Sequence, residues 1–145
     1  MSDINEALCE CLYFSCNKLS RALGKIADEE FRITGLSPTY AFLISIVNES
    51  EGISQKNIGE ILHITPSTTT RFIDKLENKG LLNRKNDGKN SFIYLTDKGL
   101  ELQTEINKAW TNFHLKCLNA LGEDEYKSLT KVINNACESI DDLLK

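Results

Sequence analysis

The sequence lacks several features that would assign it to a common class of protein. No apolar run approaches the roughly 20 residues that a membrane-spanning helix needs. The opening segment MSDINEALCE has neither the basic start nor the apolar core of a secretory signal. The sequence also contains no glycine-rich phosphate loop, no nucleophile elbow and no plausible catalytic triad. These absences predict a cytoplasmic protein that is not an enzyme.

Cysteine and histidine are too few, and too irregularly spaced, to suggest a disulfide scaffold or a zinc site. An odd number of cysteines without an export signal fits a reduced intracellular protein. Cys9 and Cys11 do not form a CxxC pair, and His63 and His114 are the remaining nitrogen ligands. We therefore expect no metal and no cofactor. The cysteines are Cys9, Cys11, Cys16, Cys117 and Cys137.

The chain is acidic overall but has a basic middle. Its formal net charge is −4. Between Ser54 and Gly99, eight Lys and Arg face five Asp and Glu, so this segment carries +3 and the remainder carries −7. Such a segment is compatible with a nucleic-acid surface, although a modest excess of one sign is more often a solvated face.

Helical signals dominate the first third of the sequence. Residues 3–28 predict one long helix with a narrow apolar stripe, and Gly35 then breaks the chain. Ser37 and Pro38 begin a second helix that is apolar nearly all round and ends near Asn48, followed by a turn at SEGI. We expect this second helix to be central and buried. The stripe of the first helix consists of Leu8, Leu12, Leu19, Leu23 and Ile26.

Two short helices joined by a tight connection come next. Ser54 caps a helix that ends at Leu62, the residues HIT connect, and Thr65 with Pro66 begins a helix that Gly80 ends. This arrangement predicts a helix-turn-helix. Its inner faces are Ile58, Ile61 and Leu62 in the first helix, and Thr69, Phe72, Ile73 and Leu76 in the second.

After Gly80 the apolar period changes from helical to alternating. The runs LLNRK and SFIYLT, separated by the turn residues NDGKN, predict a two-stranded hairpin with an exposed tip. A hairpin directly after a helix-turn-helix is the wing of a winged helix.

Two long helices are predicted at the end of the chain. Thr96 caps one that carries Trp110, and Gly122 separates it from a last helix with an a/d heptad seam from Tyr126 to Leu143. A monomer of this size would expose that seam, which soluble monomers avoid. We therefore expect a homodimer formed through the first and last helices, with two recognition helices about 34–36 Å apart.

The second helix of the helix-turn-helix begins with small hydroxyl side chains and then a cation. A helix tip that enters the major groove needs small residues for close approach and hydroxyls for base edges and phosphates. Capping alone is the alternative explanation for the hydroxyls, and a solvated turn is the alternative for the basic wing. The candidate DNA contacts are Pro66, Ser67, Thr68, Thr70, Arg71, Lys75, Arg84 and Lys89.

The stretches SQKNIGEILHITPSTTTRFIDKLENKGLLNRK and DGKNSFIYLTDKGLEL resemble the winged-helix core of the MarR family of bacterial transcription regulators. The resemblance implies a mainly α fold with a small β-hairpin, with residues 1–35 and 97–145 in a dimerisation region and residues 36–96 in a DNA-binding region. It also implies an obligate homodimer on a pseudo-palindromic operator. Such regulators are usually repressors, released by a small aromatic ligand or by cysteine oxidation.

One part of the sequence departs from the family pattern. The family wing often carries Asp-Arg-Arg, whereas this chain has Asp87-Gly88-Lys89, so both arginines are missing. Lys89 can replace one of these charges but lacks the planar fork of arginine. Wing contacts that are weaker, or less tied to A·T-rich DNA, are therefore expected.

The sensing mechanism stays open at this stage. The stretch LCECLYFS resembles the first helix of the organic-hydroperoxide sensors of the family, and Cys9 falls on their reactive cysteine. Tyr40 matches one thiolate-holding tyrosine, but Ser37 replaces another, and no Lys, Arg or His lies within a helical turn of Cys9. A packing cysteine is the alternative.

Aromatic residues provide the other candidate sensor. Phe14, Tyr40, Phe42 and Trp110 are candidates to line a ligand cleft, or they are core residues. A winged helix that serves only as a protein-interaction module is the alternative to DNA binding.

Overall fold

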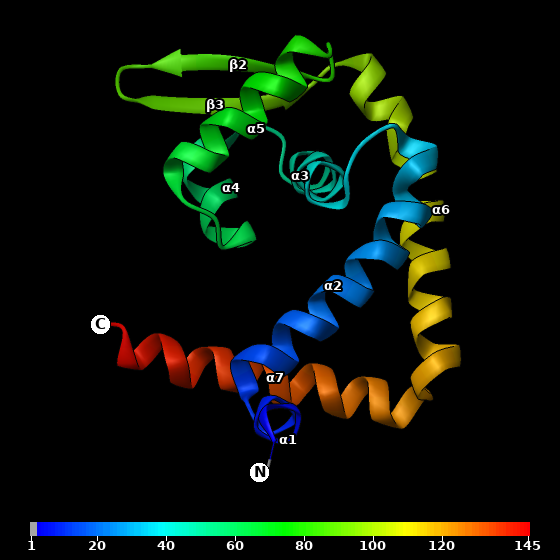
Figure 1. Cartoon of the computed structure of the whole chain (residues 1–145). Helices are drawn as coiled ribbons and strands as arrows, with labels where there is room; N and C mark the ends of the chain where they lie inside the picture. Colours follow the sequence, from blue (N-terminus) through cyan, green and yellow to red (C-terminus); the bar gives the residue numbers. More distant parts are fainter. Residues whose placement is uncertain (1–2) are drawn as a thin grey trace. The chain divides into compact units, whose positions relative to one another are not determined.

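The structure, a computed structural model, describes residues 3–145; residues 1 and 2 of the first predicted region lie outside this range. The chain divides into two compact units, one ending at Trp110 and one beginning at Thr111. Figure 1 labels the elements along the chain. They are α1 (Ile4–Cys9), α2 (Leu12–Phe31), the 3-10 turn η1 (Arg32–Thr34), α3 (Pro38–Glu49), β1 (Ile53–Ser54), α4 (Gln55–Leu62), α5 (Pro66–Asn78), β2 (Leu82–Asp87), β3 (Asn90–Leu95), α6 (Asp97–Leu121) and α7 (Glu123–Leu143). This is the mainly helical winged-helix fold that the sequence predicted.

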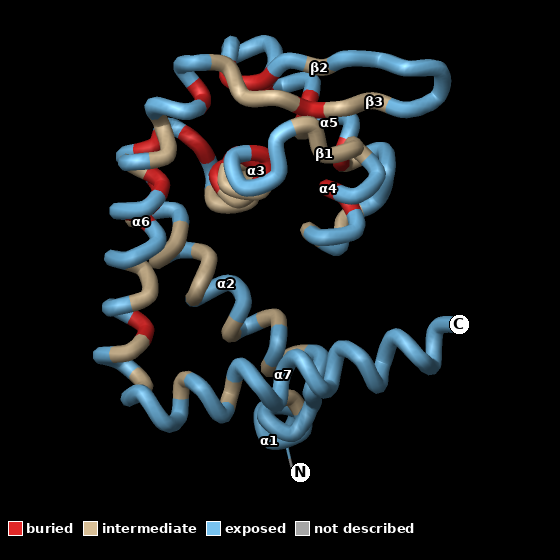
Figure 2. Tube along the Cα trace, turned by 180° about the vertical axis from the view of Figure 1, so that it is seen from behind, coloured by how far each residue is buried: buried red, intermediate tan, exposed pale blue. Residues whose placement is uncertain are grey.

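Helix α3 is the centre of the first unit. Pro38 occupies its first position, where the missing N–H has no helical partner to lose. The helix contacts α2, α4 and β3, and Figure 2 shows parts of it in the buried colour. The predicted central position is thus confirmed. The fully buried residues of α3 are Ala41, Leu43, Ile44 and Val47.

The first predicted helix is in fact two helices. Glu10 and Cys11 lie between α1 and α2, and Cys11 adopts an extended conformation with φ −86° and ψ 117°. The N–H of Cys11 donates to the carbonyl of Leu8 at 3.1 Å, so the break leaves this donor satisfied. The prediction of one continuous helix over 3–28 was therefore wrong. The sequence did not reveal the break, because neither glycine nor proline marks it. Gly35, with φ +71°, ends the helical segment as predicted.

The predicted N-caps are present at the start of each helix of the helix-turn-helix. Ser54 Oγ accepts from the N–H of Asn57 at 3.1 Å, and Thr65 Oγ1 accepts from the N–H of Thr68 at 3.2 Å. Helix α4 ends at Leu62, and the next residue, His63, has a left-handed φ of +55°. Gly80, shortly after α5, has φ +76°. The local signals therefore determine where both helices begin and end.

The two helices approach each other closely at Gly59. A Cβ at this position would lie 2.6 Å from Thr69 Oγ1, so only glycine fits without a shift. Ile58 is buried beside it, whereas Ile61 is 53% exposed. The prediction that Ile61 belongs to the inner face was wrong, because the contact with α5 is made at Ile58 and Gly59. On α5, Thr69, Ile73 and Leu76 are buried as predicted.

The sheet has three antiparallel strands in the order β1-β3-β2. Strands β2 and β3 pair as far as Asp87 and Asn90, which leaves Gly88 and Lys89 as a two-residue turn. The predicted loop NDGKN is therefore mostly strand. Strand β1 was not predicted, because Ile53 was assigned to a turn; it pairs with Ile93, 40 residues further along the chain.

The long helices α6 and α7 begin and end at predicted residues. Thr96 Oγ1 accepts from the N–H of Gly99 at 3.1 Å, and a Cβ on Gly99 would collide with the carbonyl oxygen of Leu81. Gly122, with φ +84°, separates the two helices. Cys117 on α6 is 4% exposed and belongs to the core, and its burial raises the pKa of the thiol. In the described part of the chain, no helix has the length and apolarity to cross a membrane.

Candidate nucleic-acid interface

The start of α5 presents its hydroxyl side chains at the surface. Thr65 Oγ1 donates to Thr68 Oγ1 at 2.9 Å and lies 3.2 Å from Ser67 Oγ. Pro66 and Ser67 are exposed, and Thr68 is half-buried. Thr65 is therefore the cap of the helix, and the exposed Ser67 is still accessible to a ligand.

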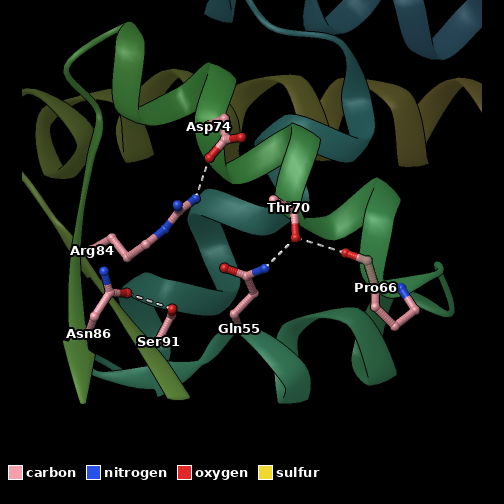
Figure 3. Close-up of polar contacts among 7 residues, drawn as sticks. All are labelled: Gln55, Pro66, Thr70, Asp74, Arg84, Asn86 and Ser91. Atoms are coloured by element: carbon pink, nitrogen blue, oxygen red, sulfur yellow. Dashed lines mark hydrogen bonds and ion pairs between the residues drawn. The ribbon is translucent and has the colours of Figure 1, made fainter. Parts of the chain in front are cut away.

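Thr70 connects the two helices of the helix-turn-helix. Its Oγ1 accepts from Gln55 Nε2 at 2.6 Å and donates to the carbonyl of Pro66 at 3.0 Å (Figure 3). Because both hydrogen bonds are internal, Thr70 retains only a lone pair for an outside donor. Gln55 did not emerge from the sequence, since its role depends on the approach of α4 to α5.

The two predicted cations of α5 differ in their surroundings. Arg71 is exposed and makes no ion pair within residues 3–145. Lys75 is also exposed, and its Nζ lies 5.2 Å from the centroid of the Tyr40 ring. A cation above an aromatic face is held by the ring quadrupole, so Lys75 has a preferred position while Arg71 is free to reach a phosphate or a base.

The wing cations are mostly engaged within the protein. Arg84 Nη2 lies 2.6 Å from Asp74 Oδ1, and Lys85 Nζ lies 4.8 Å from the centroid of the Tyr94 ring. Ser91 Oγ donates to Asn86 Oδ1 at 2.7 Å and links the two strands (Figure 3). Lys89 is exposed in the turn and has no partner among the described residues.

A groove of about 560 Å³ lies between the start of α4, the helix-helix turn and the wing turn. Lys56 lines it from α4 and Lys89 from the wing, while Glu60 is its carboxylate. Two lysines from separate elements of one groove provide a surface that suits a phosphate chain. Lys56 was not among the predicted contacts, although a lysine in the first turn of the first helix was a visible signal. The lining residues are Ser54, Gln55, Lys56, Gly59, Glu60, His63, Ile64, Pro66, Thr69, Lys89, Asn90 and Ser91.

Three of the aromatic residues predicted to line a ligand cleft contact other aromatic rings. Tyr40 stacks on Phe72 of α5 with ring centroids 4.4 Å apart, and Phe42 contacts Trp110 at 4.8 Å. Neither the groove nor a second cavity of about 470 Å³ beside Thr34 is lined by these aromatic residues. Trp110 is 50% exposed.

The other predicted sensor residues lie on the first two helices. Cys9 is exposed at the end of α1, and Phe14 is half-buried on α2. Within residues 3–145, no group of three or more His, Cys, Asp or Glu side chains is arranged to hold a metal ion.

Comparisons of sequence and of structure both find similarity to transcriptional regulators. Residues 36–90, from α3 to the wing, match the family model described as the MarR family. The HTH-type transcriptional regulator YdgJ of Bacillus subtilis (strain 168) is 25% identical over 127 residues, which cover 85% of this chain and 77% of the relative.

Two solved structures have the same fold. The PcaV transcriptional regulator from Streptomyces coelicolor, in complex with its natural ligand, is similar with a TM-score of 0.83 and 22% identity over 92% of this chain and 96% of that one. The transcriptional regulator MosR of M. tuberculosis, in complex with DNA, has a TM-score of 0.81 and 18% identity over 92% and 98%.

Proposed function

Because this chain belongs to the MarR family of transcriptional regulators, we propose that it represses transcription as a homodimer bound to a pseudo-palindromic operator. A small-molecule effector releases it from the DNA. The observation that carries the proposal is the exposed tip of α5, which carries Ser67 and Arg71 and contributes Pro66 to a groove lined by Lys56 and Lys89. As a regulator of transcription it acts in the cytoplasm, with the chromosome.

The DNA contacts follow from exposure and charge. Small side chains at the tip of α5 approach base edges in the major groove, and Arg71 contacts a guanine or a phosphate. Lys75 contacts the backbone from the same helix, and Lys56 and Lys89 hold a phosphate chain along the groove. The proposed base-reading residues are Pro66, Ser67, Thr68, Thr70 and Arg71.

The dimer is proposed from the surface of α7. The helix has no buried residue, and Ile133, Ile140 and Leu143 are 41%, 47% and 78% exposed. Contiguous apolar faces of this kind mark interaction sites in soluble proteins. A second copy that covers this face would assign residues 97–145, with residues 1–35, to dimerisation and leave residues 36–96 for DNA.

The effector is proposed to be a small aromatic compound. PcaV, a regulator of the same fold, was solved with its natural ligand. In this chain, the contact between Phe42 and the half-exposed Trp110 provides aromatic surface that such a compound could share.

A second candidate sensor is the thiol of Cys9. The observation that favours it is exposure, because an oxidant can reach only an accessible thiol. Replacing Cys9 by Ser would abolish release by peroxide and leave release by an aromatic ligand unchanged.

The function is tested by selecting bound sequences from random duplex DNA and then measuring affinity against salt. Logarithmic affinity should fall steeply with the logarithm of salt concentration, with a slope of about −0.9 for each phosphate contacted. Arg71→Ala should weaken binding by about 1–3 kcal/mol. Lys25→Ala removes an exposed cation roughly 120° around α2 from its apolar stripe. It therefore leaves the proposed dimer face intact, and as the matched control it should change DNA affinity little.

Two results would contradict the proposal. One is negligible affinity for every DNA pool, which would favour a winged helix used only to bind proteins. The other is an equal loss of affinity in Arg71→Ala and Lys25→Ala, which would indicate attraction by overall charge rather than by the tip of α5.

A further inference from the structure

Arg84, a wing residue in a basic stretch, is directed into the protein. Its Nη2 lies 2.6 Å from Asp74 Oδ1, so the ion pair joins β2 to α5 (Figure 3). The Arg84 side chain is 19% exposed, and the Asp74 side chain is 51% exposed. Arg84 Nε is buried and has no hydrogen-bond partner among the residues that the structure describes. The charge of Arg84 is therefore neutralised inside the DNA-binding unit.

The position of Arg84 is unsuited to a phosphate contact. A guanidinium that binds DNA must offer its N–H groups to the outside, as that of the exposed Arg71 can. Arg84 would first have to leave Asp74 and expose a carboxylate of the same sign as DNA. Two unfavourable steps would thus precede one favourable contact.

The ion pair instead constrains the direction of the wing. Leu82 and Ile93 attach the base of the hairpin to the core and are fully buried, but apolar burial is non-directional. A short charge-assisted hydrogen bond between β2 and α5 adds a directional constraint. The orientation of the wing sets the distance between Lys89 and the α4 side of the groove.

We propose that Arg84 is a positioning residue for the wing and that Asp74, an acidic residue on the DNA-facing helix, is required for tight DNA binding. This inference rests on the proposed function and deepens it. Arg84 holds the hairpin at the angle that lets Lys89 and Lys56 engage the same phosphate chain.

Asp74→Asn separates this role from a direct contact. If Arg84 bound DNA, the substitution would remove a repulsive carboxylate and free a cation, so affinity would rise. If Arg84 positions the wing, affinity should fall by about tenfold, within the usual range of coupling between neighbouring charged groups. The double variant Asp74→Arg with Arg84→Asp should recover most of that loss, because it restores the ion pair in reverse.

A Lys89→Ala background provides the second discriminating measurement. When the wing contact is already absent, a positioning residue has nothing left to position, so Asp74→Asn should cost less than about twofold. A direct contact by Arg84 would give losses that add. Amide hydrogen exchange in β2 and β3 should be faster in Asp74→Asn without any DNA present, and melting curves check that the fold is retained.

The outcomes are distinguishable. Wild-type protein without salt-dependent DNA affinity would overturn the proposed function and this inference together. Wild-type binding with unchanged or tighter binding by Asp74→Asn, additive losses in the Lys89→Ala background, or unchanged exchange in the hairpin would each overturn the positioning role alone.

Discussion

Helices α5 and α7 have similar amphipathic sequences, but the apolar face of α5 is buried and that of α7 is exposed. On α5, Thr69, Ile73 and Leu76 are at most 1% exposed, so its apolar face is covered within the protein. On α7, Val132 and Ile133 are 62% and 41% exposed, and no residue of the helix is buried. Figure 2 shows nearly all of α7 in the exposed colour. A helical period identifies an apolar face but does not say which molecule covers it.

The difference separates two kinds of surface. Because α5 satisfies its apolar face internally, its polar face is free to recognise a ligand without a cost in stability. Because α7 leaves an apolar face uncovered, it is suited to a partner that removes that face from water. In the proposed function, the first surface binds DNA and the second binds another copy of this chain.

The largest expected effect contrasts one isoleucine from each helix. Ile73→Ala should lower the free energy of unfolding by about 2–5 kcal/mol, because it leaves a cavity in a core that is already filled. Ile133→Ala leaves no such cavity within one chain, and its effect should depend on protein concentration through the dimer. Urea denaturation at several protein concentrations measures both. Equal and concentration-independent losses would contradict the contrast.

The second expected effect is on assembly. Replacing Ile133 and Ile140 together by Asp should place charges in the apolar face of α7 and convert the dimer to the 16.3-kDa chain. Loss of the dimer should also lower DNA affinity, since a single recognition helix reaches only one half-site. Light scattering gives the mass. Lys131→Asp, roughly 160° around the helix from Ile133, is the matched control and should leave the dimer intact.

Local signals in the sequence were enough to place α5 and its neighbours. Thr65, Pro66 and Gly80 specify the start and end of α5 through interactions within a few residues, so they can be read from the sequence alone. The break at Cys11 has no such local marker. Strand β1 depends on the pairing of Ile53 with Ile93, which a period in the sequence cannot reveal.

The candidate site likewise divides into features with local sequence signals and features that depend on long-range contacts. The pattern at the start of α5 and the turn of the wing predicted Arg71 and Lys89 as DNA contacts, and both side chains are exposed. The engagement of Arg84 with Asp74, and of Gln55 with Thr70, required the three-dimensional approach of separate elements. The predicted DNA contacts themselves stay a prediction until affinities are measured.

The third expected effect concerns how the two helices begin. Thr65 caps α5 through its side chain, whereas Gly122 at the start of α7 makes no side-chain cap. Thr65→Ala should therefore cost about 1 kcal/mol of stability and also remove the hydroxyl that organises Ser67 and Thr68. Thermal melts together with DNA affinity test this. Thr65→Ser should retain both properties, and a Ser variant as impaired as Ala would contradict a capping role.

The smallest expected effect is electrostatic and belongs to the start of α7, which lacks that cap. The hydrogen bond from Lys127 Nζ to Glu123 Oε1, 2.9 Å long, and the ammonium charge hold the pKa of Glu123 below its ordinary value. A carboxyl with a lowered folded-state pKa stabilises the protein above its unfolded-state pKa, and this contribution disappears as the pH falls through the folded-state value. Both groups are exposed, so salt should weaken the effect.

Wild type should therefore melt slightly above Glu123→Gln at neutral pH and low salt, and the two should converge below about pH 4, where carboxyls of this kind protonate. Lys127→Gln should reproduce the loss at neutral pH, because it removes the same hydrogen bond from the other side. A difference that persisted unchanged at low pH would mean that Glu123 acts through its shape rather than its charge. The start of α7 would then depend on the conformation of Gly122, and α5 and α7 would differ in how their first turns are stabilised as well as in what covers their apolar faces.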